Sequence, residues 1–108
     1  MGLFSFLRLG SGKIKNALKK GAIIIDVRTP QEFAICRIEG SRLIDQELAK
    51  EIVETWPKDT AIVTICHHGV RSLDAAMFLR SQGFTKARSM RGGTYLWSTA
   101  IDPGMPRY

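Results

Sequence analysis

Short apolar runs alternate with longer amphipathic stretches along this chain. Residues 22–25 and 61–65 are continuous runs of apolar and β-branched residues, which is typical of strands buried on both faces. Residues 43–44 and 87–90 are two further strand candidates. Residues 12–20, 46–55 and 72–82 carry apolar side chains at helical spacing, and a last helix is expected from Thr94. This alternation predicts an α/β fold with a central parallel sheet and helices on both faces.

Local start and stop signals place one further helix. Thr29 can cap a helix, Pro30 suits the first helical position, and Glu32 completes a capping box. Gly83 is expected to close the helix over 72–82, because glycine favours the position just past a helix end. The helical spacing predicts inward-facing side chains at these positions: Ile14, Ala17, Leu18, Leu48, Ile52, Val53, Ala75, Ala76, Phe78 and Leu79.

Length and charge narrow the picture further. With 108 residues, 44% of them hydrophobic, the chain is expected to form one globular domain over 1–108, with a basic N-terminal segment and helix within 1–20 and a tail at 103–108. The net charge is +6. A solvated helix face explains the lysines of the first segment better than a nucleic-acid surface, because no aromatic residue interleaves with them. Nothing demands more than a monomer, and no apolar run approaches the ~20 residues that span a bilayer.

The two cysteines, Cys36 and Cys66, do not make a disulfide scaffold. A reducing, cytoplasmic setting therefore fits better, with at least one thiol kept for its reactivity. Cys36 lies in helix-like sequence and is interpreted as a small packing residue, with a resolving thiol as the alternative.

The loop from Cys66 to Arg71 holds the strongest candidate chemistry. Cys66 follows a buried strand directly, and Ser72 opens the next helix. Such a loop aims several backbone N–H groups and the positive end of a helix dipole at one point, which makes an anion site. Gly69 permits the tight turn and Arg71 adds a positive charge, so the Cys66 thiol should ionise readily. The residues predict a thiolate nucleophile, without deciding whether it carries sulfur or phosphate.

Each of these residues also has a plainer interpretation. Cys66 could be a buried structural cysteine, and Arg71 a surface ion-pair partner, although their places beside the helix start favour the reactive roles. His67 and His68 could suggest a metal site with Cys66, but adjacent residues do not easily direct three ligands at one ion. We expect the two histidines to shape the mouth of the pocket and to add positive charge below their pKa.

Ser72 and three residues near the first long strand are assigned supporting roles. Asp26 and Arg28 follow that strand, and Glu32 lies in the helix after it. We expect Arg28 to pair with Glu32 and to hold this helix in place.

The chain resembles the rhodanese family over almost its whole length. The resemblance rests on Ile25-Asp26-Val27-Arg28 with Glu32-Phe33, Ile38-Glu39-Gly40-Ser41, Cys66-His67-His68-Gly69-Val70-Arg71-Ser72, Gly83-Phe84, and Gly92-Gly93 with Trp97. It implies a parallel five-stranded sheet and Cys66 as the sulfur-carrying nucleophile. Family sulfurtransferases have four residues between the cysteine and the position of Arg71, as here, whereas the related phosphatases have five. Cys36-Arg37-Ile38 departs from the Gly-His-Ile of most relatives.

This resemblance implies a two-step sulfur transfer. Cys66 would take the outer sulfur of a small anionic donor such as thiosulfate, with Arg71 attracting the donor. Backbone amides of residues 67 to 71 would then hold the persulfide until a thiol or a sulfur-carrier protein accepts the sulfur. No metal or organic cofactor is implied. The alternatives are a non-catalytic or sulfur-carrier interaction module and, less favoured by loop length, a cysteine phosphatase or arsenate reductase.

Overall fold

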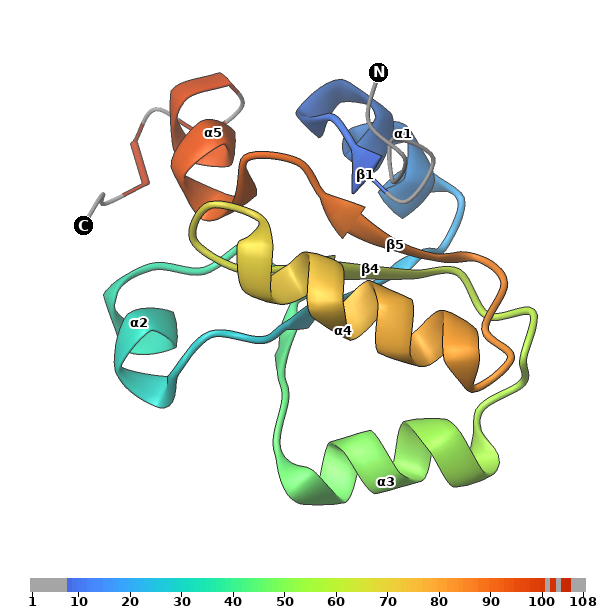
Figure 1. Cartoon of the computed structure of the whole chain (residues 1–108). Coiled ribbons are helices and arrows are strands. Elements are labelled where there is room, and N and C mark those ends of the chain that lie inside the picture. Colours follow the sequence, from blue (N-terminus) through green and yellow to red (C-terminus); the bar gives the residue numbers. More distant parts are fainter. Residues whose placement is uncertain (1–7, 101, 103, 106–108) are drawn as a thin grey trace.

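A single parallel sheet organises the computed structural model, which describes residues 8–100, 102 and 104–105. Within these residues the sheet has five strands in the order β1-β5-β4-β2-β3, and every neighbouring pair runs parallel (Figure 1). The strands are β1 (Arg8–Leu9), β2 (Ile23–Asp26), β3 (Arg42–Leu43), β4 (Ile62–Ile65) and β5 (Ala87–Met90). The predicted α/β class and parallel sheet are confirmed.

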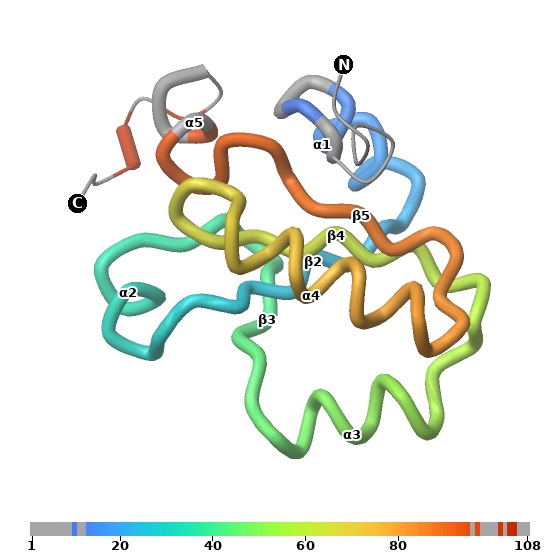
Figure 2. Tube along the Cα trace, in the orientation of Figure 1, coloured from blue at the N-terminus to red at the C-terminus, as the bar shows by residue number. Residues whose placement is uncertain are grey.

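Helices cover both faces of this sheet. On one side lie α1 (Ser11–Lys19) and α5 (Gly93–Ala100), and on the other lie α3 (Gln46–Thr55) and α4 (Val70–Ser81) (Figures 1 and 2). The short α2 (Pro30–Ile35) lies beyond the end of β2 and has no buried residue of its own. Its start is the predicted one: Thr29 accepts a hydrogen bond from the Glu32 amide, and the Glu32 side chain completes the capping box.

The core consists of two apolar clusters, one on each face of the sheet. Successive residues of a strand point to opposite faces, so the continuous apolar runs of β2 and β4 serve both clusters. Under α1 and α5 lie Ile14, Ile24, Cys36, Ile38, Val63, Ile65, Met90, Trp97 and Met105. Under α3 and α4 lie Ile25, Leu48, Ile52, Ile62, Leu79, Phe84 and Ala87.

Two details of α4 differ from the sequence expectation. The helix begins at Val70 rather than Ser72, because Gly69 adopts the left-handed conformation (φ +95°) and turns the chain into the helix two residues earlier. Phe78 is 52% exposed rather than inward-facing. The buried residues of α4 are Ser72, Ala76 and Leu79, and Phe78 lies about 100° around the helix from Leu79.

The strand β1 was not expected from the sequence. It has only two residues and carries no apolar alternation, so its strand conformation depends on pairing: Arg8 aligns with Ser89 and Leu9 with Met90 of β5.

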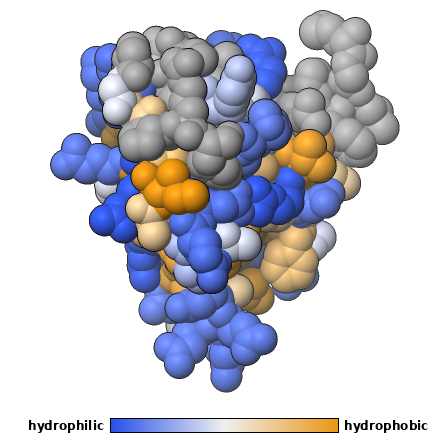
Figure 3. Space-filling view, turned by 90° about the vertical axis from the view of Figure 1, so that its left-hand side faces the viewer, coloured by the Kyte–Doolittle hydropathy of each residue, from blue (hydrophilic) through white to orange (hydrophobic). Residues whose placement is uncertain are grey.

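No helix among the described residues is both long and apolar enough to cross a membrane. The side of the molecule that includes α2 is largely hydrophilic, with small separate apolar areas (Figure 3).

Candidate functional site

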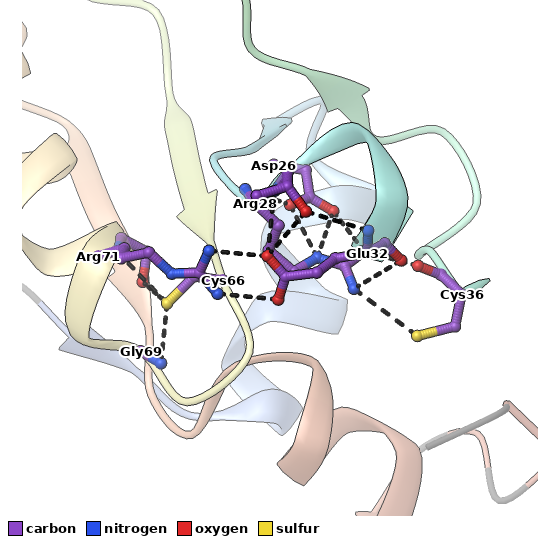
Figure 4. Close-up of polar contacts among 9 residues, drawn as sticks. Asp26, Arg28, Glu32, Cys36, Cys66, Gly69 and Arg71 are labelled. Atoms are coloured by element: carbon purple, nitrogen blue, oxygen red, sulfur yellow. Dashed lines mark hydrogen bonds and ion pairs between the residues drawn. The ribbon is translucent and has the colours of Figure 1, made fainter. Parts of the chain in front are cut away.

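The side chain of Cys66 lies at the carboxyl end of β4, where the chain turns into α4. Its sulfur receives the backbone N–H of Gly69 at 3.0 Å and that of Ser72 at 3.4 Å, and the His68 amide contributes a further hydrogen bond (Figure 4). The residue is 1% exposed. The amides therefore converge on the sulfur, although the donors include Ser72, one residue beyond the expected span of 67 to 71.

The carbonyl groups of the same loop point the other way, toward α5. The Thr94 amide donates to the Cys66 carbonyl at 2.8 Å, and the Tyr95 amide donates to the His67 carbonyl at 3.1 Å. The first turn of α5 thus binds the outer side of the loop and leaves its amides free to face inward. Because the N-terminal amides of a helix have no partners within the helix, they are well suited to this role.

Gly93 allows this close approach of α5 to the loop. A methyl group at Gly93 would overlap the carbonyl oxygens of Cys66 and His67, and its φ of +61° also disfavours any other residue. In the sequence, Gly92-Gly93 is noted only among the residues that carry the family resemblance. The paired glycines were the available signal, but their contact with the Cys66 loop depends on the order of the strands.

A buried hydroxyl pair lies behind the sulfur. The Ser72 hydroxyl is 3.4 Å from Cys66 Sγ and 2.7 Å from the Ser89 hydroxyl of β5, and both serines are fully buried. Thr64 of β4 holds the Ser72 carbonyl through its own hydroxyl at 2.6 Å. Ser72 was predicted as a supporting residue. Ser89 was missed, because the sequence of a short strand does not show which residues of other elements its side chains contact.

Hydrogen bonding decides the ionisation of Cys66. Burial raises the pKa of the thiol, but the hydrogen bonds from the Ser72 side chain and from the amides of Ser72, Gly69 and His68 outweigh it. The pKa of Cys66 consequently lies below its ordinary value. The site therefore favours a thiolate, the form that acts as a nucleophile.

Replacing Ser72 by alanine is expected to raise the pKa of Cys66, because the variant loses a hydroxyl that stabilises the negative sulfur. Alkylation by iodoacetamide follows the thiolate fraction, so its half-maximal rate should move to higher pH. The measurement uses a Cys36→Ser background so that only Cys66 reacts. Ser81→Ala, at the exposed end of the same helix, should leave the midpoint in place, and an unchanged midpoint in Ser72→Ala would contradict the prediction.

Arg28 is held in a buried ion pair with Asp26. Their closest atoms, Nη2 and Oδ2, are 2.7 Å apart, and neither side chain is exposed to solvent. Arg28 also donates to the backbone carbonyls of Glu32 at 3.3 Å and Cys36 at 2.6 Å. The buried ion pair of Arg28 is thus with Asp26, whose buried carboxylate requires a cationic partner, whereas a pair with Glu32 is expected from the sequence. Arg28 nonetheless holds the end of α2, through its carbonyl groups.

The carboxylate of Glu32 pairs instead with Arg71. Their side chains form a two-pronged ion pair with distances of 2.8 Å and 3.0 Å (Figure 4). The Arg71 side chain is 47% exposed and that of Glu32 is 18% exposed. The structure thus contains the ion-pair arrangement that sequence reasoning ranked below a direct anion-binding role for Arg71.

Two histidines and a tyrosine lie together beside the loop. The rings of His67 and His68 meet edge to face with centroids 4.1 Å apart, and the Tyr95 ring is 6.0 Å and 5.4 Å from them. Burial, and next the neighbouring His68, lower the pKa of His67. His67 is therefore largely neutral near pH 7 and contributes little of the positive charge expected of it. Val70, the first residue of α4, is 68% exposed.

Cys36 caps the C-terminal end of α2 and packs into the cluster under α1 and α5. Its sulfur lies 3.7 Å from Nη1 of Arg28. Both cysteines are free thiols. Across residues 8–100, 102 and 104–105, no group of three or more His, Cys, Asp or Glu side chains is arranged to hold a metal ion.

Comparison with known proteins finds related sequences and the same fold. Residues 11–100 match the family model of the rhodanese-like domain. A thiosulfate sulfurtransferase, GlpE of Pseudomonas aeruginosa, is 34% identical over 93 residues, which cover 86% of this chain and 84% of GlpE.

Two solved structures are similar over most of this chain. The human single-domain sulfurtransferase TSTD1 has a TM-score of 0.70 with 25% identity, and the match covers 87% of this chain and 96% of TSTD1. Reduced CoADR-RHD of Bacillus anthracis has a TM-score of 0.76 with 28% identity, covering 93% of this chain but only 18% of that one.

Proposed function

The chain belongs to the family of rhodanese-like domains, and from this membership we propose that it is a sulfurtransferase that carries sulfur as a persulfide on Cys66. One observation carries the proposal: backbone amides of Gly69 and Ser72 point at the Cys66 sulfur from within 3.4 Å. Such donors stabilise negative charge on the sulfur itself and on a sulfur atom attached to it. The curated relative named above is a thiosulfate sulfurtransferase, which agrees with this chemistry.

In the first half-reaction the Cys66 thiolate attacks the outer sulfur of a donor such as thiosulfate. A new S–S bond forms to Cys66, the old S–S bond breaks, and sulfite leaves with the electron pair of that bond. The persulfide then carries a negative charge on its outer sulfur. The inward-facing amides and the N-terminal end of α4 favour that charge.

In the second half-reaction a nucleophilic acceptor attacks the outer sulfur of the persulfide. The bond between the two sulfurs breaks, and Cys66 leaves as a thiolate. A low pKa suits Cys66 to this role, because a more acidic thiol is a better leaving group. A thiol or a sulfur-carrier protein is the acceptor that we propose, with cyanide as a laboratory substitute.

The length of the loop supports sulfur rather than phosphate as the transferred group. Four residues separate Cys66 from Arg71, as in the sulfurtransferases that the chain resembles. The residue Cys66 is 1% exposed. Because Arg71 is paired to Glu32 beside the Cys66 loop, we propose a donor that is a small anion able to take the place of the Glu32 carboxylate on Arg71.

We propose that the protein is a monomer and works in a reducing, cytoplasmic setting. Such a setting suits two free thiols.

The test is the intact mass of the protein after incubation with thiosulfate and removal of the excess. We expect a gain of about 32 Da, one sulfur atom, that maps to the peptide containing Cys66 and disappears on treatment with a thiol, as covalent catalysis requires. A protein that gains no sulfur but hydrolyses an aryl phosphate would be a phosphatase. A protein that neither gains sulfur nor hydrolyses an aryl phosphate would favour the interaction-module alternative. Either result would overturn the proposal.

A further inference from the structure

The Arg71–Glu32 ion pair connects the reactive loop to a helix that is distant in the sequence. Arg71 lies in the first turn of α4, five residues after Cys66, and its side chain extends across to α2 (Figure 4). Arg71 Nη1 donates to Glu32 Oε1 at 2.8 Å, and Arg71 Nη2 donates to Glu32 Oε2 at 3.0 Å. Planar two-pronged pairs of this kind are among the more strongly oriented charged contacts in proteins.

Glu32 is itself fixed before it meets Arg71. Its Oε1 atom accepts hydrogen bonds from the Thr29 amide at 3.1 Å and from the Thr29 hydroxyl at 3.2 Å, as part of the capping box of α2. Arg28 in turn holds the Glu32 carbonyl. The Glu32 carboxylate is therefore held in position by its own helix, independently of its contact with Arg71.

The charge balance at the mouth follows from these pairings. Arg28 is compensated by the buried Asp26, and Arg71 by Glu32. His67 is largely neutral near pH 7 because burial, and next His68, lower its pKa. Arg28, Arg71 and His67 together consequently contribute less positive charge beside the Cys66 loop than their residue types suggest, although the chain as a whole carries a net charge of +6.

We infer that Glu32 is a specificity-determining residue that disfavours doubly charged sulfur donors and favours singly charged ones, such as thiosulfonate or persulfide anions. This inference rests on the proposed sulfurtransferase function. A donor that uses Arg71 must displace or approach the Glu32 carboxylate. The repulsion grows in proportion to the charge of the donor.

The experiment compares wild type with Glu32→Gln, using thiosulfate and methanethiosulfonate as donors. Methanethiosulfonate has a methyl group where thiosulfate has one charged oxygen, so the transferred sulfur is alike and the charge falls from two to one. Glutamine preserves the capping box while removing the negative charge. In a two-step reaction with cyanide as acceptor, kcat/KM for the donor reports only the first half-reaction.

For Glu32→Gln we expect kcat/KM for thiosulfate to rise about three- to tenfold, mainly through a lower KM. The rise for methanethiosulfonate should be clearly smaller, and the difference between the donors should shrink at high salt, where charges about 10 Å apart are screened. Glu54→Gln makes the same change of net charge at the exposed end of α3 and should leave both donors unaffected.

The outcomes separate this inference from the proposed function. If the wild type takes sulfur from neither donor, the sulfurtransferase proposal itself fails. If the wild type takes sulfur but Glu32→Gln leaves the ratio of the two donors unchanged, the inference is wrong. It is equally wrong if the variant slows both donors alike, because Glu32 would then only orient Arg71.

Discussion

Cys66→Ser is expected to lose sulfur transfer by about three orders of magnitude or more, because a serine hydroxyl does not ionise in this loop and cannot carry a persulfide. The folded state should survive the change. Serine is smaller than cysteine, and its oxygen can still accept the Gly69 amide that now reaches the sulfur at 3.0 Å. The measurements are the thiosulfate–cyanide transfer rate and the thermal midpoint of unfolding.

The matched control for this variant is Cys36→Ser. Cys36 is also buried, and Nη1 of Arg28 lies 3.7 Å from its sulfur. Among the described residues, no backbone amide donates a hydrogen bond to this sulfur. It therefore lacks the donors that lower the pKa of Cys66. We expect Cys36→Ser to retain most of the activity. Activity that persists in Cys66→Ser, or that vanishes in Cys36→Ser while the fold is intact, would contradict the assignment of the nucleophile.

Gly93→Ala is the second substitution with a large expected effect. The added methyl group overlaps the carbonyl oxygens of Cys66 and His67, and the φ of +61° disfavours alanine. The left-handed conformation costs about 1–2 kcal/mol, and overpacking at a rigid contact costs about 1–3 kcal/mol more. To relieve the overlap, α5 must move away from the loop. The amides that converge on the sulfur would then lose their orientation.

The prediction is tested by urea unfolding and by the pH dependence of Cys66 alkylation. Gly93→Ala should lower the free energy of unfolding and raise the pKa of Cys66 together, with donor kcat/KM falling at least about tenfold. Gly21→Ala is the control, because Gly21 has a φ of +91° but no atom within 4 Å of an added methyl group. It measures the backbone cost alone. If Gly93→Ala costs no more than Gly21→Ala and leaves the pKa of Cys66 unchanged, the proposed support of the loop by α5 is wrong.

The sequence predicts those elements of the fold whose signals are local. The apolar runs at β2 and β4 and the capping signals at Thr29 identify their elements, because those signals lie within a few residues of one another. The helix α3 and the strand β5 match the expected residues. The pairing of β1, in contrast, depends on a partner 81 residues away, and no local pattern marks it.

The same distinction applies to the pairing of charges around the site. Asp26, Arg28, Glu32 and Arg71 are all identified from the sequence, but the buried pair of Arg28 with Asp26 is not. Burial decided the matter, since a carboxylate at the end of β2 that loses its water needs a cation more than an exposed one does. Burial is a property of the packed sheet and of α2 upon it, and sequence spacing does not report it.

The order of residues in this chain predicts a nucleophilic cysteine between a buried strand and a helix, with a loop of four residues between it and Arg71. Those features are local, so neighbouring residues suffice to define them. The third dimension decided the rest: which amides reach the sulfur, that Ser89 supports Ser72, that α5 binds the outer side of the loop, and that Glu32 holds Arg71. The contacts of Ser89, of α5 and of Glu32 join segments far apart in the sequence, which the parallel order of β2, β4 and β5 brings within hydrogen-bonding distance.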